Sequence, residues 1–331
     1  MARPTEAAGK LTKEALGRFP MYPLRAIARY LVYEHGLLFD NDIEKARAAI
    51  RYYTGRMGEA NRLSQPVDSP YFRPPGVVTR MPQTWRKPRK AYNLSPGYWL
   101  ILADIHIPYH EPKPLESAVK YGQDQKVTGI LLNGDFQDCA SVGFWHVEKR
   151  DFNKEMESVI DSLGWLKHEF PKQEIIYKPG NHEFRLPRYY VTKAPEMVGY
   201  PLAAMESVLQ LEARDIDFLD YKQIVQAGKL PIFHGDELKG TYSPVSAARG
   251  LFNKTHTFAV TSHFHQTSEF STTSARNELL TTWSTGCLCD LRPDYNPWGN
   301  RWNWGFALVN VEKNGSFEFI NKRILPSGKV V

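Results

Sequence analysis

From residue 98 onward the chain alternates short apolar runs with helical stretches, and this alternation restricts the possible folds more than any other feature. Six runs have the length of buried β-strands: 98–103, 127–132, 174–177, 230–233, 257–261 and 279–283. Helical patterns at 114–122 and 153–169 lie between the first three runs. Near the end, 305–311 and 316–320 flank Lys313-Asn314-Gly315, which is typical of a hairpin. The order predicts an α/β fold with some antiparallel pairing, organised as two sheets.

The composition excludes several classes of protein. A chain of 331 residues can bury a full-sized core, as one large domain with an appendage or as two domains. The hydrophobic share of 42% and the charged share of 24% are those of a soluble globular protein. No apolar run approaches the roughly 20 residues that span a bilayer, and no secretory signal is recognisable. We therefore expect a cytoplasmic protein without a membrane partner.

The three cysteines argue against a disulfide framework. Cys139, Cys287 and Cys289 are an odd number and contain no Cys-x-x-Cys pair of the zinc-binding kind. Cys287 and Cys289 alternate on a strand-like segment, so their side chains should face the same way. Packing explains that pattern more simply than metal binding does.

Residues 1–63 have the pattern of a small helical module. Residues 23–33 place apolar side chains at helical spacing, and a second helix is expected over 42–53, capped by Asp40 or Asn41. The first 100 residues hold 17 Lys or Arg against 8 Asp or Glu, whereas the remainder holds 25 against 28. This asymmetry fits either an appendage that meets an anionic partner or a solvated basic face. If the pair is helix-turn-helix-like, nucleic acid would be held by Arg47, Arg51 and Arg56.

Residues 64–97 have the composition of a linker or an extended strap. Seven prolines occur in these 34 positions, together with a basic cluster over 85–90 that includes Trp85. The cluster could contact a nucleic-acid backbone. Alternatively, the segment lies across the neighbouring domain.

Polar residues of unusual chemistry follow five of the predicted strands. Five of the ten histidines stand in these clusters, which read Asp104-x-His106, Asn133-Gly-Asp135-x-x-Asp138, Gly180-Asn181-His182-Glu183, His234-Gly-Asp236 and His263-x-His265. In open α/β sheets ligands bind beyond the carboxyl ends of strands, so the clusters could converge in one crevice. Imidazole, carboxylate and amide ligands without thiolate suit Mn, Fe, Zn, Ni or Co. A pair of metals needs a bridging carboxylate, and Asp135 is the natural bridge.

Any one of these clusters by itself is an ordinary polar pair at a strand end. Five in this order, each after an apolar run, are not explained that way. The order D-x-H, G-D-x-x-D, G-N-H-E, H-G and H-x-H resembles the calcineurin-like metallophosphoesterases over residues 98–325. The resemblance implies a four-layer α/β/β/α sandwich of two mixed sheets with two divalent ions, Mn first among them. In that family a hydroxide that bridges the metals attacks phosphorus.

The resemblance also assigns individual residues. One metal would take Asp104, His106, Asp135 and His265, and the other would take Asp135, Asn181, His234 and His263. His182 would stabilise the phosphate and act as general acid to the leaving oxygen, paired with Asp138, while Glu183 would orient a ligand.

Three departures from the family pattern are visible. Ser262 replaces the usual glycine before His263, and Asp138 stands where the family's repair nucleases have histidine. Cys139 stands where the phosphatases have an arginine that grips phosphate. The anchor must then come from elsewhere, and the candidates are Arg185, Lys239 and Arg249.

The preferred function is a phosphodiesterase or nuclease that acts on nucleic acid, because the basic N-terminal part could hold a polyanion. Two alternatives stay open: a phosphomonoesterase for phosphoprotein or a small ester, which Asp138 favours, and a nucleic-acid-binding protein with a vestigial phosphoesterase fold. The aromatic loop 295–304 either stacks a base or packs. Residues 51–56 are similar to leaders of bacteriophage phosphoesterases, which would place the protein in a host cytoplasm. The oligomeric state is left open.

Overall fold

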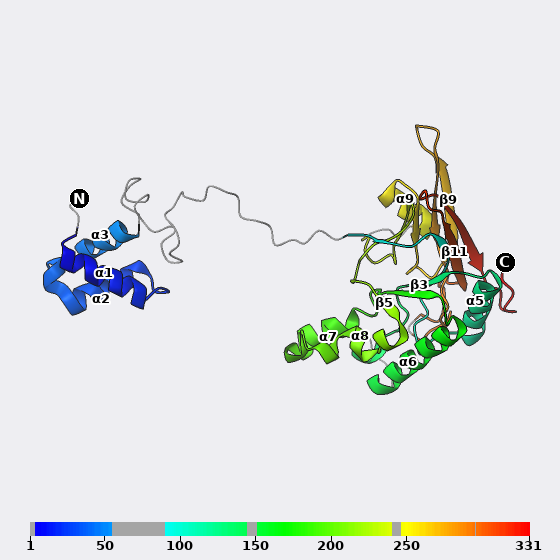
Figure 1. Ribbon diagram of the computed structural model, residues 1–331, viewed down its shortest axis with the longest axis horizontal. Coiled ribbons are helices and arrows are strands. Elements are labelled where there is room, and N and C mark those ends of the chain that lie inside the picture. The colour runs from blue at the N-terminus through cyan, green and yellow to red at the C-terminus, as the bar shows by residue number, and fades with distance from the viewer. Residues whose placement is uncertain (1–3, 55–89, 144–150, 240–245, 295) are drawn as a thin grey trace. The chain divides into compact units, whose positions relative to one another are not determined.

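The chain divides into two compact units, Met1–Lys87 and Pro88–Val331. The computed structural model describes residues 4–54, 90–143, 151–239, 246–294 and 296–331. Figure 1 shows the elements of each unit. Most of the predicted linker 64–97 lies outside the described residues, and so does Arg56, which was predicted to contact nucleic acid.

The first unit is built from helices that bury one apolar face each. They are α1 Glu6–Arg18, α2 Leu24–His35 and α3 Ile43–Tyr53, with a 3-10 turn, η1, at Gly36–Phe39. Leu16, Ile27, Leu31 and Ile50 lie in their common core. The cap of α3 is Asp42, whose carboxylate accepts from the Glu44 backbone N–H, rather than Asp40 or Asn41. The two predicted helices are confirmed, whereas α1 was not predicted.

The second unit contains two six-stranded mixed sheets. One sheet has the order β12-β11-β2-β3-β4-β5, with β2 to β5 parallel and β11 antiparallel to both of its neighbours. Its strands are β2 Gly97–Leu102, β3 Gly129–Asn133, β4 Glu174–Lys178, β5 Ile216–Phe218, β11 Gly305–Val311 and β12 Phe317–Arg323. The other, ordered β1-β6-β7-β8-β10-β9, consists of β1 Tyr92–Asn93, β6 Val225–Ala227, β7 Leu230–Ile232, β8 Ala259–Thr261, β10 Leu279–Ser284 and β9 Ser268–Thr273.

Side-chain alternation along the strands explains how the two sheets pack. In β2, Trp99 and Ile101 enter the core shared by the sheets, whereas Leu100 and Leu102 face the opposite side. That opposite side is covered by α5 Pro112–Asp124 and α6 Phe152–Glu169, which lie along it in Figure 1. The outer face of the second sheet is covered by α9 Ala247–Thr255. The unit is therefore an α/β/β/α sandwich, as predicted.

The remaining elements are short and lie in the loops. They are α7 Arg185–Lys193, α8 Met205–Val208, and the 3-10 turns η2 Ala140–Val142, η3 Pro195–Met197, η4 Pro201–Ala203 and η5 Glu212–Arg214. Each of the six predicted apolar runs overlaps a strand, and the predicted hairpin is β11–β12. Within the described parts of the chain, no helix is long and apolar enough to cross a membrane.

Candidate metal centre

The predicted ligands come together where strands of both sheets end. Asp104 and His106 follow β2, Asp135 and Asp138 follow β3, and Asn181 follows β4. The loop after β7 carries His234, and the loop after β8 carries His263 and His265. Because β2, β3 and β4 are parallel, their carboxyl ends meet at one edge of the sheet. The hydrogen bond from the His263 backbone N–H to Asp104 Oδ2, 2.9 Å long, joins the loops of the two sheets.

One group of ligand atoms surrounds a point between the loops of β2 and β8. His106 Nε2 lies 3.2 Å from His265 Nε2, and His265 Nε2 lies 3.1 Å from Asp104 Oδ1. Asp135 Oδ2 is 4.0 Å from His106 Nε2. Metal–ligand bonds of about 2.1 Å at right angles separate the donor atoms by about 3.0 Å. The spacing of these four side chains therefore fits one metal ion.

A second group shares Asp135 with the first. His234 Nε2 lies 3.2 Å from Asp135 Oδ2 and 3.3 Å from Asn181 Oδ1. Asp135, His234 and His263 have ligand atoms within 4.8 Å of one another, which is close enough to hold an ion. Asp135 thus reaches both groups, as a bridging carboxylate would.

The hydrogen bonds of the histidine rings test whether the groups fit metal ions. His106 Nδ1 donates to Asp138 Oδ2 at 2.9 Å, and His234 Nδ1 donates to the Asn133 carbonyl at 2.9 Å. Each bond places a proton on Nδ1, so Nε2 is the ring nitrogen that would bind an ion. His263 Nδ1 is buried and has no hydrogen-bond partner. An unpartnered ring nitrogen at this position is what a missing metal bond would leave, so the residues fit the ions.

Two glycines are required by the close approach of the ligands. A Cβ on Gly180 would lie 2.3 Å from Asp135 Oδ1 and 2.9 Å from His234 Nε2. A Cβ on Gly134 would lie 2.3 Å from His234 Nδ1, and Gly134 also has a φ of +90°. A larger residue at either position would occupy the space of the second group.

The backbone of the site is strained. Among the described non-glycine residues with positive φ are five of the seven predicted ligands, namely Asp104, His106, Asp135, His263 and His265. Left-handed conformations cost on the order of 1 kcal/mol or more each outside glycine and persist where the surroundings enforce them. Such strain is typical of functional sites.

Glu183 holds the loops of β3 and β4 together. Its buried carboxylate accepts five hydrogen bonds, from the backbone N–H groups of Asp135, Phe136, Gln137 and Gly180 and from the Tyr177 hydroxyl. Burial and the charge of Asp135 raise its pKa. Glu183 faces the backbone rather than a ligand side chain, so its contribution is to position the turn that carries Asn181 and His182.

The charges of the site compensate one another. Burial alone would raise the pKa of Asp135, but His234 and His182 hold it well below its usual value. Burial lowers the pKa of His234 and His265, yet Asp135 raises the first to about 10 and Asp104 with Cys287 raises the second to about 10. His234 and His265 therefore pair with Asp135 and Asp104 in the metal-free protein, and an ion that bound there would displace their protons.

Asp138, His182 and Arg185 form a connected group beside the ligands. His182 Nδ1 donates to the Asp138 carbonyl at 3.0 Å and lies 3.2 Å from Asp138 Oδ2. Arg185 donates to Asp138 Oδ1 at 3.0 Å and to His182 Nε2 at 2.9 Å. Burial lowers the pKa of His182, but Asp135 and Asp138 raise it above its usual value. The Arg185 bond requires a lone pair on Nε2, so protonation of His182 there requires Arg185 to move.

The other predicted anchors make no contact with this group. Arg249 lies on α9 with its guanidinium 5.6 Å from the centre of the Phe270 ring, and Lys239 is exposed. In the helical unit Arg47 pairs with Glu44, and Arg51 is half-buried. Ser262 replaces glycine without leaving its hydroxyl unpaired, because Asn133 and Thr285 both donate to it.

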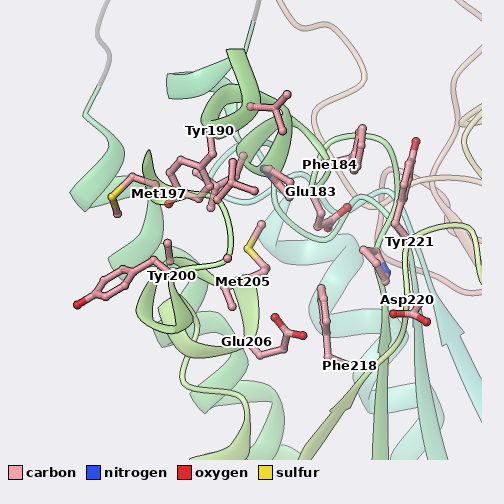
Figure 2. A pocket seen from close by; sticks show the side chains of 18 of the residues that line it. Glu183, Phe184, Tyr190, Met197, Tyr200, Met205, Glu206, Phe218, Asp220 and Tyr221 are labelled. Carbon is pink, nitrogen blue, oxygen red and sulfur yellow. The ribbon is translucent and has the colours of Figure 1, made fainter. Parts of the chain in front are cut away.

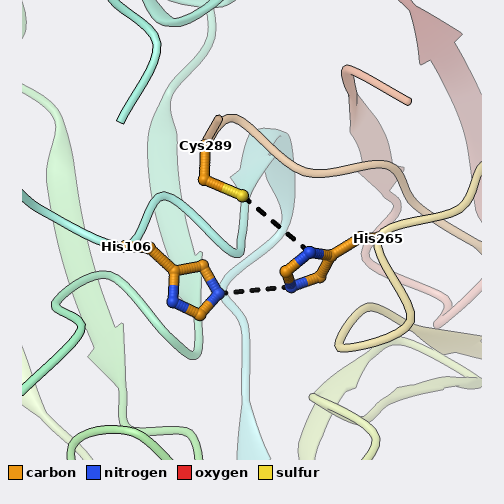
Figure 3. Close-up of side chains that lie close together, drawn as sticks. All are labelled: His106, His265 and Cys289. Atoms are coloured by element: carbon orange, nitrogen blue, oxygen red, sulfur yellow. Dashed lines mark hydrogen bonds between the residues drawn. The ribbon is translucent and has the colours of Figure 1, made fainter. Parts of the chain in front are cut away.

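Cys289, for which the sequence favours packing, is buried and also contacts a predicted ligand. Its Sγ lies 3.8 Å from His265 Nδ1, the nitrogen opposite the one that faces His106 (Figure 3). Cys289, His106 and His265 also form a group that could hold a metal ion. The alternation of Cys287 and Cys289 was the available signal.

Sequence reasoning also missed a buried ion pair behind His234. Lys178, at the end of β4, is fully buried and pairs with Glu237. Glu237 in turn accepts from the backbone N–H groups of His234 and Gly235. The signal was a lysine that ends an apolar strand.

The aromatic loop lies against the first ligand group. The Trp302 ring centre is 4.2 Å from that of His265, and Trp304 Nε1 donates to the Cys289 carbonyl. Trp298 is 79% exposed. Two of the loop's tryptophans therefore pack, and one is open to solvent.

No protein-family profile and no curated protein matches the chain. Among solved structures, it is similar to vacuolar protein sorting 29 from Cryptosporidium parvum, with 14% identity over 72% of this chain and 96% of that one and a TM-score of 0.38. The zinc complex of Vps29 from Entamoeba histolytica gives 11% identity, 71% and 96% coverage and a TM-score of 0.34. The phosphoesterase Yfce from E. coli gives 12% identity over 67% of this chain and 98% of that one, with a TM-score of 0.30. Identities this low say nothing about activity or substrate.

Proposed function

We propose that the chain is a phosphoester hydrolase that depends on two divalent metal ions and acts on phosphodiesters of nucleic acid. The observation that carries the proposal is the convergence of two ligand groups on Asp135, beside a buried ring nitrogen of His263 that has no hydrogen-bond partner. Two adjacent ions of this kind, when bound, supply Lewis acidity to the phosphoryl oxygens and to the attacking water. Mn is the first candidate because the ligands are nitrogen and oxygen without thiolate in the expected set.

Arg185 and His182 would act on the substrate itself. The Arg185 guanidinium contacts His182 and is 24% exposed, so it can turn toward an incoming phosphate. Arg185 would then take the role of the phosphate-binding arginine at whose position this chain has Cys139. That movement would free His182 Nε2 to accept a proton, and the charges of Asp135 and Asp138 favour its retention. His182 would then donate this proton to the leaving oxygen.

A phosphomonoesterase is the second candidate, because Arg185 and His182 together would also suit a dianionic phosphate. A vestigial fold is disfavoured by the strained backbone at five ligands, which has a cost and no structural benefit. The predicted DNA-binding role of the helical unit gains little support from charge. Residues 4–54 hold 8 Lys or Arg and 6 Asp or Glu, so the basic excess lies mainly in 55–97.

The test is hydrolysis by metal-stripped protein refilled with Mn. Bis-p-nitrophenyl phosphate, p-nitrophenyl phosphate and labelled single- and double-stranded DNA and RNA are offered side by side, with His182→Asn as the blank. We expect turnover of the diester and a nucleic acid, lost in the blank. Turnover of the monoester alone would move the protein to the phosphatases, and no turnover of any ester would overturn the proposal.

A further inference from the structure

Helix α7 leads directly from the turn that carries Asn181 and His182, and it is strongly basic. Its nine residues include Arg185, Arg188 and Lys193 and no acidic residue. Arg188 and Lys193 are exposed, and neither forms an ion pair with another described residue. Tyr189, between them, is 40% exposed. Cations interleaved with aromatic rings are typical of surfaces that bind unpaired nucleic acid.

The opposite side of α7 forms one wall of a cavity of about 380 Å³. Figure 2 shows its lining, with Tyr190 on one side, Phe184 and Tyr221 on the other, and Met205 between them. Such a volume lies in the range of small-molecule sites. Among the described residues no lysine or arginine lines the cavity, whereas the exposed carboxylates Glu206 and Asp220 do. An anionic group is therefore unsuited to it, and an aromatic ring that carries hydrogen-bond donors is well suited.

The cavity adjoins the candidate metal centre through one of its walls. Phe184, two residues after His182, stacks on Tyr221 with ring centres 4.2 Å apart and planes inclined by 10°. The Tyr221 hydroxyl donates to Asp236, two residues after His234. The stacked pair is thus attached to the loops that carry His182 and His234. A group bound in the cavity would lie next to a phosphate held at His182.

We infer that α7 and this cavity bind an unpaired stretch of nucleic acid, with one base in the cavity and backbone phosphates at Arg188 and Lys193. The inference rests on the proposed function, since it names the substrate of the same site. The amino or ring N–H groups of a base would donate to Glu206 or Asp220, and its ring would contact Phe184 and Tyr190. A base inside a duplex cannot enter a cavity, so unpaired substrate is required. An apolar protein segment would also fill the cavity, but it would leave the two cations without a partner.

Binding is measured first, on metal-free full-length protein, so that no turnover is needed. Fluorescence anisotropy reports the affinity for a labelled single-stranded oligonucleotide and for its duplex. Val198→Trp places a bulky ring at the mouth of the cavity, where Val198 is 56% exposed, and Leu202→Trp is the matched control at an exposed residue outside the lining. Arg188→Gln with Lys193→Gln is matched by Lys120→Gln with Lys154→Gln, which removes two exposed cations elsewhere.

We expect tighter binding of the single strand than of the duplex. Val198→Trp should weaken single-strand binding about tenfold, the loss of one base–aromatic contact, and Leu202→Trp should not. The double cation variant should reduce the slope of log K against log salt by about 1.4, as two phosphate contacts do on a single strand, while its control leaves the slope unchanged. Equal behaviour of a variant and its control, or equal affinity for duplex and single strand, would overturn the inference.

Turnover separates this inference from the proposed function. With Mn-loaded protein, Val198→Trp should lower kcat/KM for thymidine 5′-p-nitrophenyl phosphate about tenfold and leave bis-p-nitrophenyl phosphate, which has no base, unchanged. Equal loss on both esters overturns the base assignment. If wild-type protein hydrolyses neither ester, the proposed function fails, and the binding measurements still decide whether the surface holds nucleic acid.

Discussion

The helical unit and the sandwich bury different kinds of side chain. In the described part of the helical unit the buried polar residues are Thr12 and Thr54, and each hydroxyl bonds the carbonyl four residues earlier. All buried charged side chains of the described residues belong to the sandwich, mostly in the loops that follow its strands. Burying a charged side chain costs free energy, and the interactions that the charge forms inside the protein often do not offset this cost. The comparison teaches that the sandwich has been shaped by a chemical requirement that left no such trace in the described helices.

The strongest test of this contrast is the removal of the bridging carboxylate. Asp135→Asn should lower the rate of metal-dependent hydrolysis by about a thousandfold or more and reduce the bound metal below two ions per chain. Metal content is measured by elemental analysis, and kcat with bis-p-nitrophenyl phosphate. A variant that keeps full activity would falsify the bridging assignment. Arg47→Gln, in the helical unit, is the matched control.

Glu183→Gln should lower the free energy of unfolding, because this carboxylate beside the site stabilises the fold. The amide retains one acceptor oxygen for five donors, so buried N–H groups lose their partners, at a cost on the order of 3–5 kcal/mol in the free energy of unfolding. Urea unfolding followed by tryptophan fluorescence measures it. Glu44→Gln breaks the exposed pair with Arg47 and should cost less than about 0.5 kcal/mol. Similar costs for the two variants would contradict the comparison.

Acid should weaken the sandwich through Glu237. Burial would raise the pKa of this carboxyl from 4.5, but Lys178 lowers it to about 2. A lowered folded-state pKa stabilises the protein above pH 4.5, and this contribution is lost as the pH falls from about 4.5 to about 2. The amount is on the order of 3 kcal/mol. Glu237→Gln should be destabilised near neutral pH and should approach wild type only as the pH falls to about 2, as urea unfolding across this range will decide.

Cys289 should affect metal affinity moderately. Replacement by alanine removes the contact with His265 Nδ1 and should weaken metal binding by about tenfold, whereas serine, which can still accept a hydrogen bond, should recover part of it. Competition with a chelator measures the affinity. The spectrum of the cobalt-loaded protein tells whether the sulfur itself is a ligand, since a thiolate–cobalt band would place it on the ion. Unchanged affinity in Cys289→Ala would return this thiol to the packing role.

The smallest effect is expected from deletion of Met1–Lys87, the first compact unit. The sandwich has its own core and contains the whole ligand set, so hydrolysis of bis-p-nitrophenyl phosphate should stay within about twofold of wild type. DNA binding measured beside it reports whether residues 1–87 hold nucleic acid at all. Loss of both activities would show that the deleted part is structural to the sandwich.

The sequence predicted the parts of the fold that rest on regular patterns. β2, β3 and β4 are apolar runs of strand length, and predicted ligands lie in the loops that follow them. Helix α1 escaped prediction because Gly9 weakens its helical pattern. A Cβ at Gly9 would lie 2.1 Å from the Tyr53 hydroxyl, so a larger residue there would require the Tyr53 side chain to move. β9 was missed because its sequence, Ser-Glu-Phe-Ser-Thr-Thr, is polar for most of its length.

The candidate site was predictable in its residues and not in its connections. Motif order singled out the side chains that converge on Asp135. It did not indicate that Arg185 would reach His182, because that contact depends on α7 starting immediately after the turn. Nor did it reveal the Lys178–Glu237 pair, which joins residues 59 positions apart. Contacts between distant loops depend on the packing of the two sheets, which local patterns do not encode.

The five hydrogen bonds of Glu183 have a consequence for how such chains are studied. A survey of alanine variants scored by activity would group Glu183 with Asp135 and His182, since all three would be inactive. Of the three, only the Glu183 variant would be inactive because it is unfolded, so neither added metal nor a better leaving group would restore its activity. The motif G-N-H-E therefore contains residues of two kinds: Asn181 and His182, which are proposed for the chemistry, and Glu183, which holds the turn in place. A search that requires the glutamate selects chains that can build the turn, whether or not they retain a reaction to perform there.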